Sequence, residues 1–285
     1  MADKDQTCSS ASSCSRESCE GCPSKGGGFA SFRVEQNAES NIRHVIGVVS
    51  GKGGVGKSLV TASLANALAK SGARVGILDA DITGPSIPKM YGLTGPAEAL
   101  SETQILPVVT PNGIKVMSLN LIMEDPEQAV IWRGPVIAGV VKQFWTDVVW
   151  GELDYLLVDM PPGTGDVPLT VFQSLPVDGI FIVTSPQDLV RMIVTKALNM
   201  AKAMDVPVLG LIENYSYLEC PDCGRKIEVF GKSRIEEIAK ETGLTLAGRI
   251  PIEPSYSEKA DEGAFAEVDN GYIQAAMDCL RKAAR

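Results

Sequence analysis

Hydrophobic and polar positions alternate in blocks along most of the chain. Five short runs are almost continuously apolar: HVIGVVS (44–50), RVGILDA (74–80), DYLLVDM (154–160), DGIFIVT (178–184) and VPVLGLI (206–212). Such runs are typical of parallel strands that are covered on both faces. Between them, residues 58–72 and 188–204 have the spacing of apolar positions that predicts helices. The pattern therefore predicts an α/β fold, a doubly wound and mostly parallel sheet with helices on both faces.

Residues 1–40 have a different composition. They are rich in Ser, Cys, Gly, Glu and Lys, include GGG at 26–28, and show no apolar periodicity. This composition is typical of a segment that cannot bury a core of its own. We therefore predict a flexible, cysteine-containing arm over residues 1–40 and one folded domain over residues 41–285.

The charge and hydropathy of the chain narrow the choice of partners. A net charge of −9 argues against a nucleic acid or an anionic lipid surface as the main partner. The sequence contains no apolar run long enough to span a bilayer, and its first residues lack the apolar core of a signal peptide. We expect a cytoplasmic protein with no membrane or nucleic-acid partner. The last segment, 270–285, predicts a helix that packs on the core.

A phosphate-binding motif follows the first predicted strand and opens the first predicted helix. The stretch GKGGVGKS fits G-x-x-x-x-G-K-S in the order that the motif requires. Its glycines let successive N–H groups face a phosphate, and the helix N-terminus adds partial positive charge. We predict that Lys57 contacts the β- and γ-phosphates and that the Ser58 hydroxyl binds Mg²⁺. The predicted nucleotide-binding residues of the loop are Gly51, Lys52, Gly53, Gly54, Val55, Gly56, Lys57 and Ser58.

Polar side chains follow three other predicted strands. Asp79 and Asp81 follow the second strand, Asp159 ends the third, and Asn214 follows the fifth. Ligands of open α/β sheets gather at this carboxyl edge. Asp159 is predicted to hold Mg²⁺ through water, although a single strand-end aspartate can instead cap a helix. The Asn214 amide can pair with an adenine edge or, alternatively, form a turn.

The stretch KGGVGK (52–57) resembles the deviant Walker A motif of the MinD, ArsA and nitrogenase iron-protein superfamily. The resemblance implies a nucleotide-dependent homodimer in which Lys52 reaches the phosphates held by the other subunit. It also implies that Asp81 lies near the attacking water and that Asp79 lies near the magnesium shell. The superfamily uses an asparagine at the position of Asn214, which favours ATP as the nucleotide. On this basis the expected catalytic residues are Lys52, Lys57 and Asp81.

Six of the seven cysteines fall into two groups. Cys220 and Cys223, in LECPDCGRK, can turn two sulfurs toward one metal, whereas a tetrahedral thiolate site needs four ligands. The residues alone leave structural zinc open, because C-P-x-C-G is half of a zinc ribbon, and also leave open an intrachain site completed from the arm. The arm carries C-x5-C-x4-C-x2-C, which provides either a second cluster site or incidental or zinc-binding cysteines in a disordered segment; its members are Cys8, Cys14, Cys19 and Cys22. The seventh, Cys279, is expected to fill core space.

Over residues 42–265 the sequence resembles the Mrp/ApbC family of iron–sulfur carrier ATPases. The matching segments, in order, are DADITGPSIPKM, IWRGP, WGELDYLLVDMPPGTGD, TSPQD, GLIENYS and CPDC. The resemblance implies an ATPase of slow turnover that holds a [4Fe–4S] cluster at a homodimer interface, with Cys220 and Cys223 from each chain, since a two-fold axis turns one pair into four thiolates. It implies a cluster donor and apo iron–sulfur proteins as partners.

The same resemblance extends weakly into the arm. CEGC (19–22) resembles the middle of the N-terminal cluster motif of the family's eukaryotic cytosolic branch, but the final cysteine of that motif is absent. Arg133, in IWRGP, matches the family without a chemical role that the sequence supports. The alternatives are a MinD/ParA-like positioning ATPase and an ATP-coupled electron donor that resembles the nitrogenase iron protein.

Overall fold

The computed structural model describes residues 33–82, 84–123, 134–186 and 190–284. The four cysteines of the predicted arm, and Arg133, lie outside these ranges.

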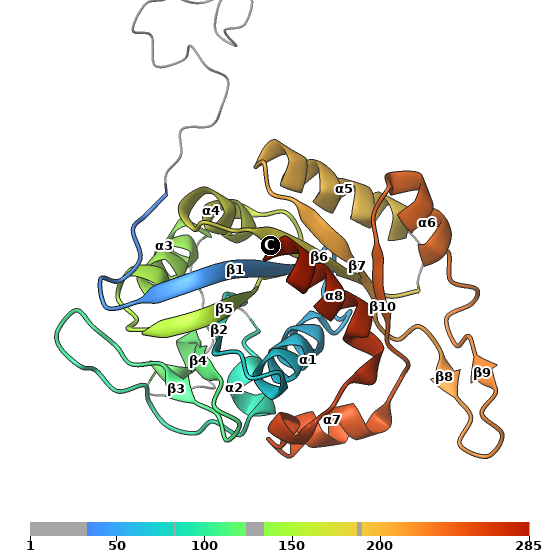
Figure 1. The fold of residues 1–285 in the computed structure, drawn as a ribbon, viewed down its shortest axis with the longest axis horizontal. Coiled ribbons are helices and arrows are strands. Elements are labelled where there is room, and N and C mark those ends of the chain that lie inside the picture. The colour runs from blue at the N-terminus through green and yellow to red at the C-terminus, as the bar shows by residue number, and fades with distance from the viewer. Residues whose placement is uncertain (1–32, 83, 124–133, 187–189, 285) are drawn as a thin grey trace, which may run out of the picture. The chain divides into compact units, whose positions relative to one another are not determined.

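An eight-stranded sheet forms the centre of the described chain (Figure 1). Its order is β10-β7-β6-β1-β5-β2-β4-β3, and every pair of neighbours is parallel except β3 and β4. A separate antiparallel pair, β8 and β9, forms a hairpin. The five predicted strands are β1, β2, β5, β6 and β7, so the predicted fold class is confirmed. The strands are β1 Asn41–Ser50, β2 Val75–Asp79, β3 Val108–Val109, β4 Lys115–Met117, β5 Glu152–Asp159, β6 Gly179–Thr184, β7 Val208–Glu213, β8 Leu218–Glu219, β9 Lys226–Ile227 and β10 Leu246–Arg249.

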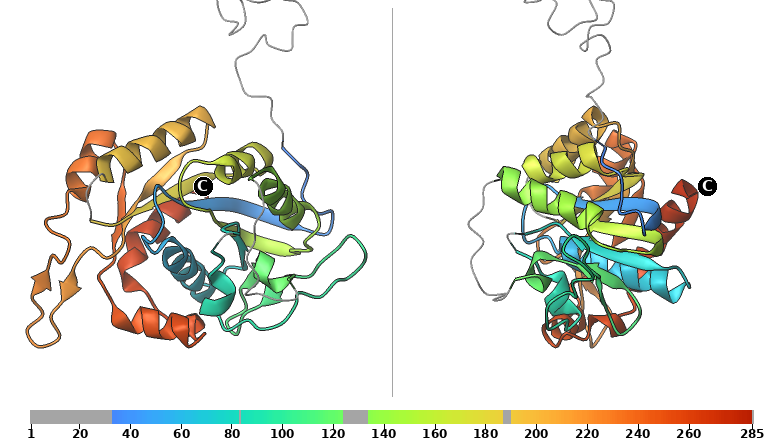
Figure 2. Two further views of the ribbon diagram at one scale, coloured as in Figure 1. Left: turned by 180° about the vertical axis from the view of Figure 1, so that it is seen from behind. Right: turned by 90° about the vertical axis from the view of Figure 1, so that its left-hand side faces the viewer.

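Helices cover both faces of the sheet (Figures 1 and 2). Helices α3, α4, α5 and α6 lie on one face, and α1 and α8 lie on the other. The helices are α1 Lys57–Lys70, α2 Ile87–Met90, α3 Gly134–Thr146, α4 Asp166–Ser174, α5 Val190–Ala203, α6 Ile235–Thr242, α7 Pro254–Asp261 and α8 Gln274–Ala283, with short 3₁₀ turns at η1 Leu119–Leu121, η2 Phe265–Glu267 and η3 Gly271–Ile273.

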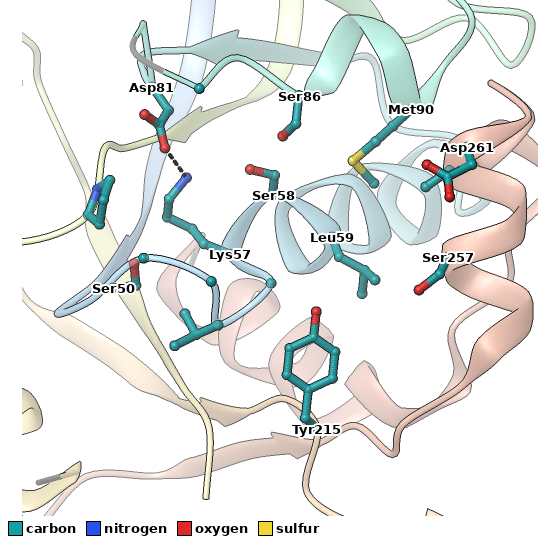
Figure 3. A pocket seen from close by; sticks show the side chains of 17 residues that line it. Ser50, Lys57, Ser58, Leu59, Asp81, Ser86, Met90, Tyr215, Ser257 and Asp261 are labelled. Atoms are coloured by element: carbon teal, nitrogen blue, oxygen red, sulfur yellow. Dashed lines mark ion pairs between the residues drawn. The ribbon is translucent and has the colours of Figure 1, made fainter. Parts of the chain in front are cut away.

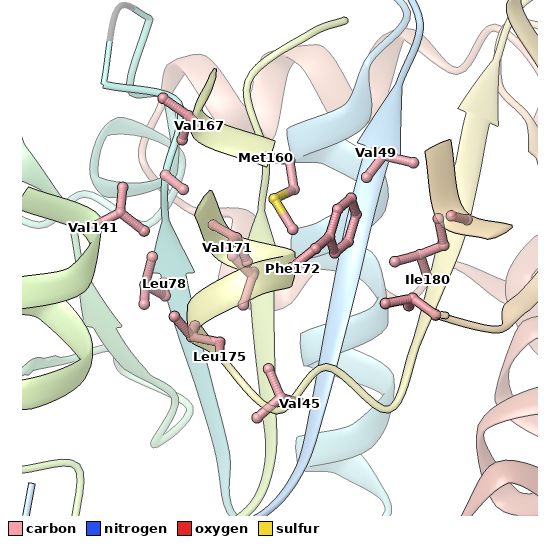
Figure 4. Close-up of a cluster of buried hydrophobic side chains, with 14 of the residues drawn as sticks. Val45, Val49, Leu78, Val141, Met160, Val167, Val171, Phe172, Leu175 and Ile180 are labelled. Atoms are coloured by element: carbon pink, nitrogen blue, oxygen red, sulfur yellow. The ribbon is translucent and has the colours of Figure 1, made fainter. Parts of the chain in front are cut away.

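Each face of the sheet buries its own hydrophobic cluster. In β1, Val45 and Val49 face the cluster under α3–α6, whereas Ile46 and Val48 face the cluster under α1 and α8. Figure 4 shows the first of these, where Phe172 packs between Met160 and Val49. Burial on both faces explains why the central strands read as continuous apolar runs rather than as alternating ones. Because the sheet is packed on both faces, the positions of its strand ends are fixed.

The compact unit begins at Arg33, earlier than the predicted boundary at residue 41. Segment 33–40 is tied to the helical layer: the indole N–H of Trp145 in α3 donates to the Val34 carbonyl at 2.9 Å, and the Val34 amide donates to Ser174 of α4 at 2.9 Å. The side-chain amide of Asn37 donates to the Thr146 carbonyl at 3.0 Å. Its polar composition concealed these contacts, because they are made mainly by the backbone.

Candidate functional site

The loop between β1 and α1 has the backbone shape of a phosphate cradle. Gly54 and Gly56 have φ angles of +76° and +75°, a region that other residues rarely adopt. At Gly56 a second constraint applies, because a β-carbon there would lie 2.1 Å from Nδ2 of Asn214. Glycine at position 56 therefore serves both the turn and the close approach of a neighbouring strand end.

Charged groups converge beside this loop. The Lys57 ammonium lies 2.8 Å from Oδ1 of Asp159 and 3.6 Å from Oδ2 of Asp81. Asp159 also accepts from the hydroxyls of Ser58 at 2.5 Å and Thr61 at 2.8 Å. Asp79 is opposite Asp159 in the register of β2 and β5 and is fully buried. The sheet thus brings together Lys57, Ser58 and the three predicted aspartates.

Burial sets the protonation of this cluster. Desolvation, reinforced by the adjacent Asp159 carboxylate, raises the pKa of Asp79 well above its ordinary value. Burial alone would lower the pKa of Lys57, but Asp159, Asp81 and Asp79 together outweigh it and raise that pKa. Lys57 therefore stays charged, and Asp79 holds its proton more strongly than an ordinary aspartate does.

A cavity of about 480 Å³ opens from the loop (Figure 3). Figure 3 shows the Tyr215 ring pointing into it toward Leu59, with Ser257 and Asp261 of α7 at its far side. The volume falls in the range of small-molecule sites. The lining residues are Ser50, Gly53, Gly54, Val55, Gly56, Lys57, Ser58, Leu59, Asp81, Gly84, Ser86, Met90, Pro162, Tyr215, Ser257, Ala260 and Asp261.

Three predicted nucleotide-binding residues, Gly51, Lys52 and Asn214, are not among the described residues that line the cavity. Asn214 is buried, and its side-chain amide nitrogen donates to the Val55 carbonyl at 3.0 Å. In this structure the Asn214 side chain therefore binds the backbone of the phosphate loop. Lys52 is half-buried at the start of the loop, and its backbone carbonyl accepts from the Ser50 hydroxyl at 3.0 Å. The predicted contacts of Asn214 with adenine and of Lys52 with a second subunit stay predictions.

Cys220 and Cys223 lie on the turn of the β8–β9 hairpin. The turn is closed by two backbone bonds, from the Cys220 amide to the Arg225 carbonyl at 3.0 Å and from the Gly224 amide to the Cys220 carbonyl at 2.9 Å. Gly224 has a φ of +67°, the left-handed conformation that glycine accepts easily. Cys220 is half-exposed, Cys223 is exposed, and neither is in a disulfide.

The turn prepares the Cys220 sulfur as a ligand. The backbone N–H of Cys223, followed by that of Asp222 and the Cys223 side chain, donates toward this sulfur and lowers the pKa of the Cys220 thiol. A lowered pKa favours the thiolate, which is the form that binds metals. Within the described ranges, no three His, Cys, Asp or Glu side chains are placed to hold one metal ion. The hairpin alone therefore provides two thiolate ligands.

The C-terminal segment packs as predicted. Helix α8 buries Ala276, Met277 and Leu280, and Cys279 packs half-buried against the same cluster. Burial raises the pKa of the Cys279 thiol. None of the described helices combines the length and the apolar character needed to cross a membrane.

Several contributors to the site were not predicted from the sequence, among them Thr61, Ser118 and Tyr215. Thr61 bonds Asp159, Ser118 donates to Asp79 at 3.3 Å, and Tyr215 lines the cavity. Thr61 lies one helical turn after Lys57, and this spacing places both residues on one face of α1. The spacing could therefore have indicated Thr61 as a site residue from the sequence. Ser118 and Tyr215 lie in loops, where no periodicity marks them.

A parallel sheet whose first strand passes through a glycine loop into a helix carrying Lys57 and Ser58, with Asp159 at the end of the adjoining strand, defines a P-loop NTPase. Solved structures with a similar fold include MinD of Aquifex aeolicus, with a TM-score of 0.56 at 24% identity over 84% of this chain and 95% of that one. This likeness concerns the fold. A family model described as the ParA-type NUBPL iron-transfer P-loop NTPase matches residues 41–284, and the chain belongs to this family.

Closer relatives carry more specific names. The iron-sulfur cluster carrier protein of Methanocaldococcus jannaschii is 46% identical over 86% of this chain and 87% of its own length. The protein of the same name from Clostridium perfringens is 46% identical over 91% and 94%. A nucleotide-binding protein of Archaeoglobus fulgidus, solved with ADP, matches with a TM-score of 0.71 at 45% identity, covering 79% of this chain and 88% of that one.

Proposed function

We propose that this chain binds and slowly hydrolyses ATP, and that two copies carry one [4Fe–4S] cluster between their hairpins and deliver it to apo-proteins. The observation that carries the proposal is the exposed turn that presents Cys220 and Cys223 together, in the same domain as a complete phosphate loop. The relatives named as cluster carriers, and the ADP-bound neighbour, support both halves of it.

The residues beside the loop suit phosphoryl transfer. The loop amides and the Lys57 ammonium would bind the phosphates, and Lys57 would exchange its carboxylate partners for phosphate oxygens. Asp81, at the cavity wall, would orient the attacking water. Lys52 of a second copy would add positive charge where it develops on the phosphates. The protein's contribution is positioning and charge neutralisation.

The donor set fits a magnesium ion. The Ser58 hydroxyl lines the cavity and is bonded to Asp159, which lies opposite Asp79 in the sheet register; the side-chain oxygens of these three residues are the ligand type that Mg²⁺ prefers. When bound, the ion would neutralise charge on the nucleotide phosphates. Asp159, which accepts from the Ser58 hydroxyl, fixes the orientation of that hydroxyl.

The cluster is the cargo, and its binding needs more thiolates than one hairpin has. A [4Fe–4S] cluster takes four cysteine thiolates, and a two-fold axis through two hairpins would provide them. The exposure of Cys223 suits release, because an acceptor thiol has to reach the iron. A cluster enclosed by a single chain would be harder to pass on.

Anaerobic reconstitution with ferrous iron and sulfide tests this function. We expect the full-length chain to form a dimer whose mass doubles that of the chain and to hold about two iron atoms per chain at the hairpin. The Cys220→Ala/Cys223→Ala variant should lose that iron and its sulfide, and Cys279→Ala, the matched control, should keep both. A monomer that retains its full iron at the hairpin, or colourless metal without sulfide, contradicts the proposal.

A second variant separates nucleotide use from cargo binding. Lys57→Ala removes the ammonium that pairs with Asp159 and would contact the phosphates, and Lys57 lies outside the hairpin. It should lose ATP binding and cluster delivery while it keeps most of its capacity to hold a cluster, measured by iron content and by transfer to an apo-acceptor. Delivery at the wild-type rate would show that the nucleotide has no part in transfer.

A further inference from the structure

One buried charge lies outside the phosphate site. Among the described residues, the charged side chains that are buried are Lys57, Asp79, Asp159 and Glu213. The first three form the cluster beside the loop. Glu213 ends β7, is 1% exposed, and has no role in the proposed hydrolysis. A buried carboxylate is costly unless it is fully hydrogen-bonded, so its partners indicate what it is for.

Glu213 closes the base of the cysteine hairpin. Its Oε2 accepts from the Ser216 hydroxyl at 2.5 Å, and its Oε1 accepts from the Ser233 hydroxyl at 2.6 Å. Ser216 precedes β8 and Ser233 follows β9, so each carboxylate oxygen binds a different leg of the hairpin. Arg249 of β10 completes the group, with Nε 3.4 Å from Oε2 and 2.9 Å from the Ser216 hydroxyl.

The residues that follow Glu213 contact the phosphate loop. Asn214 donates to the Val55 carbonyl at 3.0 Å, and Tyr215 lines the nucleotide cavity, where a β-carbon at Gly56 would lie 3.1 Å from its hydroxyl. Tyr215 has a φ of +57°, which a bulky side chain rarely adopts. Residues 213–217 are therefore a short connector in which Asn214 is bonded to the loop and the adjacent Glu213 is bonded to both legs of the hairpin.

We propose that Glu213 is a positioning residue through which nucleotide binding at the loop changes the position and reactivity of Cys220 and Cys223. The inference rests on the proposed function, since it concerns how the two halves of that function communicate. A nucleotide that shifts Val55 or Gly56 changes the contacts of Asn214 and Tyr215. Because the adjacent Glu213 carboxylate binds both legs, the hairpin then moves as one unit. The shift is limited by the difference in nucleotide affinity between the two arrangements.

The test measures the reactivity of the two thiols in cluster-free, full-length protein. Alkylation of Cys220 and Cys223 by iodoacetamide is followed by peptide mass spectrometry, with and without saturating Mg²⁺–ATP. In the wild type we expect the nucleotide to change the rate about fivefold or more, the usual scale of coupling between sites. In Glu213→Gln, which keeps the shape of the side chain but loses its charge, the ratio should fall to within about twofold of one.

Two further variants separate coupling from a structural role. Glu236→Gln removes an exposed carboxylate that lies 3.2 Å from the same Arg249, and it should keep the wild-type ratio. Ser233→Ala removes the bond between Glu213 and one leg of the hairpin only, and it should give a smaller ratio of alkylation rates with and without the nucleotide than the wild type. This variant provides the test if Glu213→Gln does not fold. A merely structural Glu213 would change both rates by the same factor and leave the ratio intact.

The outcomes also distinguish this inference from the proposed function. A wild-type ratio of one, or a ratio preserved in both Glu213→Gln and Ser233→Ala, overturns the role of Glu213, whatever the iron content. Failure of the wild type to bind iron and sulfide overturns the carrier function, yet leaves the alkylation ratios interpretable because no cluster is present in that assay.

Discussion

The ion pair between Lys57 and Asp159 provides the sharpest test of the electrostatics of the phosphate site. Both side chains are almost fully buried, at 6% and 0% exposure, and their charged atoms are 2.8 Å apart. At an effective dielectric constant of about 20, that separation gives an attraction of about 6 kcal/mol. Desolvation offsets much of it, but removal of one partner leaves a buried charge without compensation, which costs about 3–5 kcal/mol. We expect this loss for Lys57→Met in the nucleotide-free protein.

Urea unfolding, followed by the fluorescence of the buried Trp145 and Trp150, measures the effect. The cycle contains Lys57→Met, Asp159→Asn and the double variant, and its coupling energy should be about 1–3 kcal/mol. Lys70→Met is the matched control, because Lys70 lies on the same helix in an exposed pair with Asp269, where about 0–1 kcal/mol is expected. The reasoning is refuted if Lys57→Met costs no more than the control, or if the two changes add within about 0.5 kcal/mol.

Three further predictions concern single features. The folded-state pKa of Asp79 lies well above its ordinary value of 3.8, so its contribution to stability is full below that value and falls as the pH rises toward the folded-state pKa. Asp79→Asn should therefore gain stability over the wild type as the pH rises from 3.8 toward that pKa, and a constant difference in urea midpoints contradicts this. Gly56→Ala would place a β-carbon at a positive φ and 2.1 Å from a neighbouring atom, so it should lose more stability than Gly54→Ala, where φ is positive but no atom lies within 4 Å. Equal losses of about 1–3 kcal/mol in the two variants would show that the close approach is not a constraint. If the arm binds a second cluster, Cys19→Ser/Cys22→Ser should remove one cluster's worth of iron, and an unchanged iron count would exclude such a cluster.

The central part of the fold could be predicted because a single rule governs it. Strands buried on both faces are mostly apolar along their buried length, and β1, β2, β5, β6 and β7 follow that rule apart from the carboxylates that end β2, β5 and β7. Strand β10, with the sequence LAGR, and the two- and three-residue strands β3 and β4 lie near the sheet edges and have too few apolar positions to show a period. Their existence depends on the neighbour that pairs with them, and the sequence does not state which segment that is.

The predicted site likewise contains residues that could be placed from the sequence and residues that could not. Lys57, Ser58, Asp81 and Asp159 could be placed because parallel strands end at one edge, so that residues after different strands converge. The contact of Asn214 with Val55 could not be predicted, because it joins positions 159 residues apart. It depends on where the end of β7 lies relative to the phosphate loop. The predicted domain boundary at residue 41 differs from the start of the compact unit at Arg33 for a related reason. Segment 33–40 is held by the backbone groups of Val34 together with the Asn37 side chain, and contacts made by backbone groups leave no mark on side-chain composition.

The two chemistries proposed for this chain make opposite demands on their surroundings. Charge neutralisation at a phosphate benefits from buried groups such as Asp159, because a low dielectric strengthens each contact. Transfer of a cluster needs accessible thiols such as Cys223, which a buried position would withhold from an acceptor. One domain can meet both demands only if the two sites are separate and mechanically connected. Glu213 has the properties that such a connection requires, because it is buried at a strand end, next to Asn214, which contacts the loop, and is bonded to both legs of the exposed hairpin.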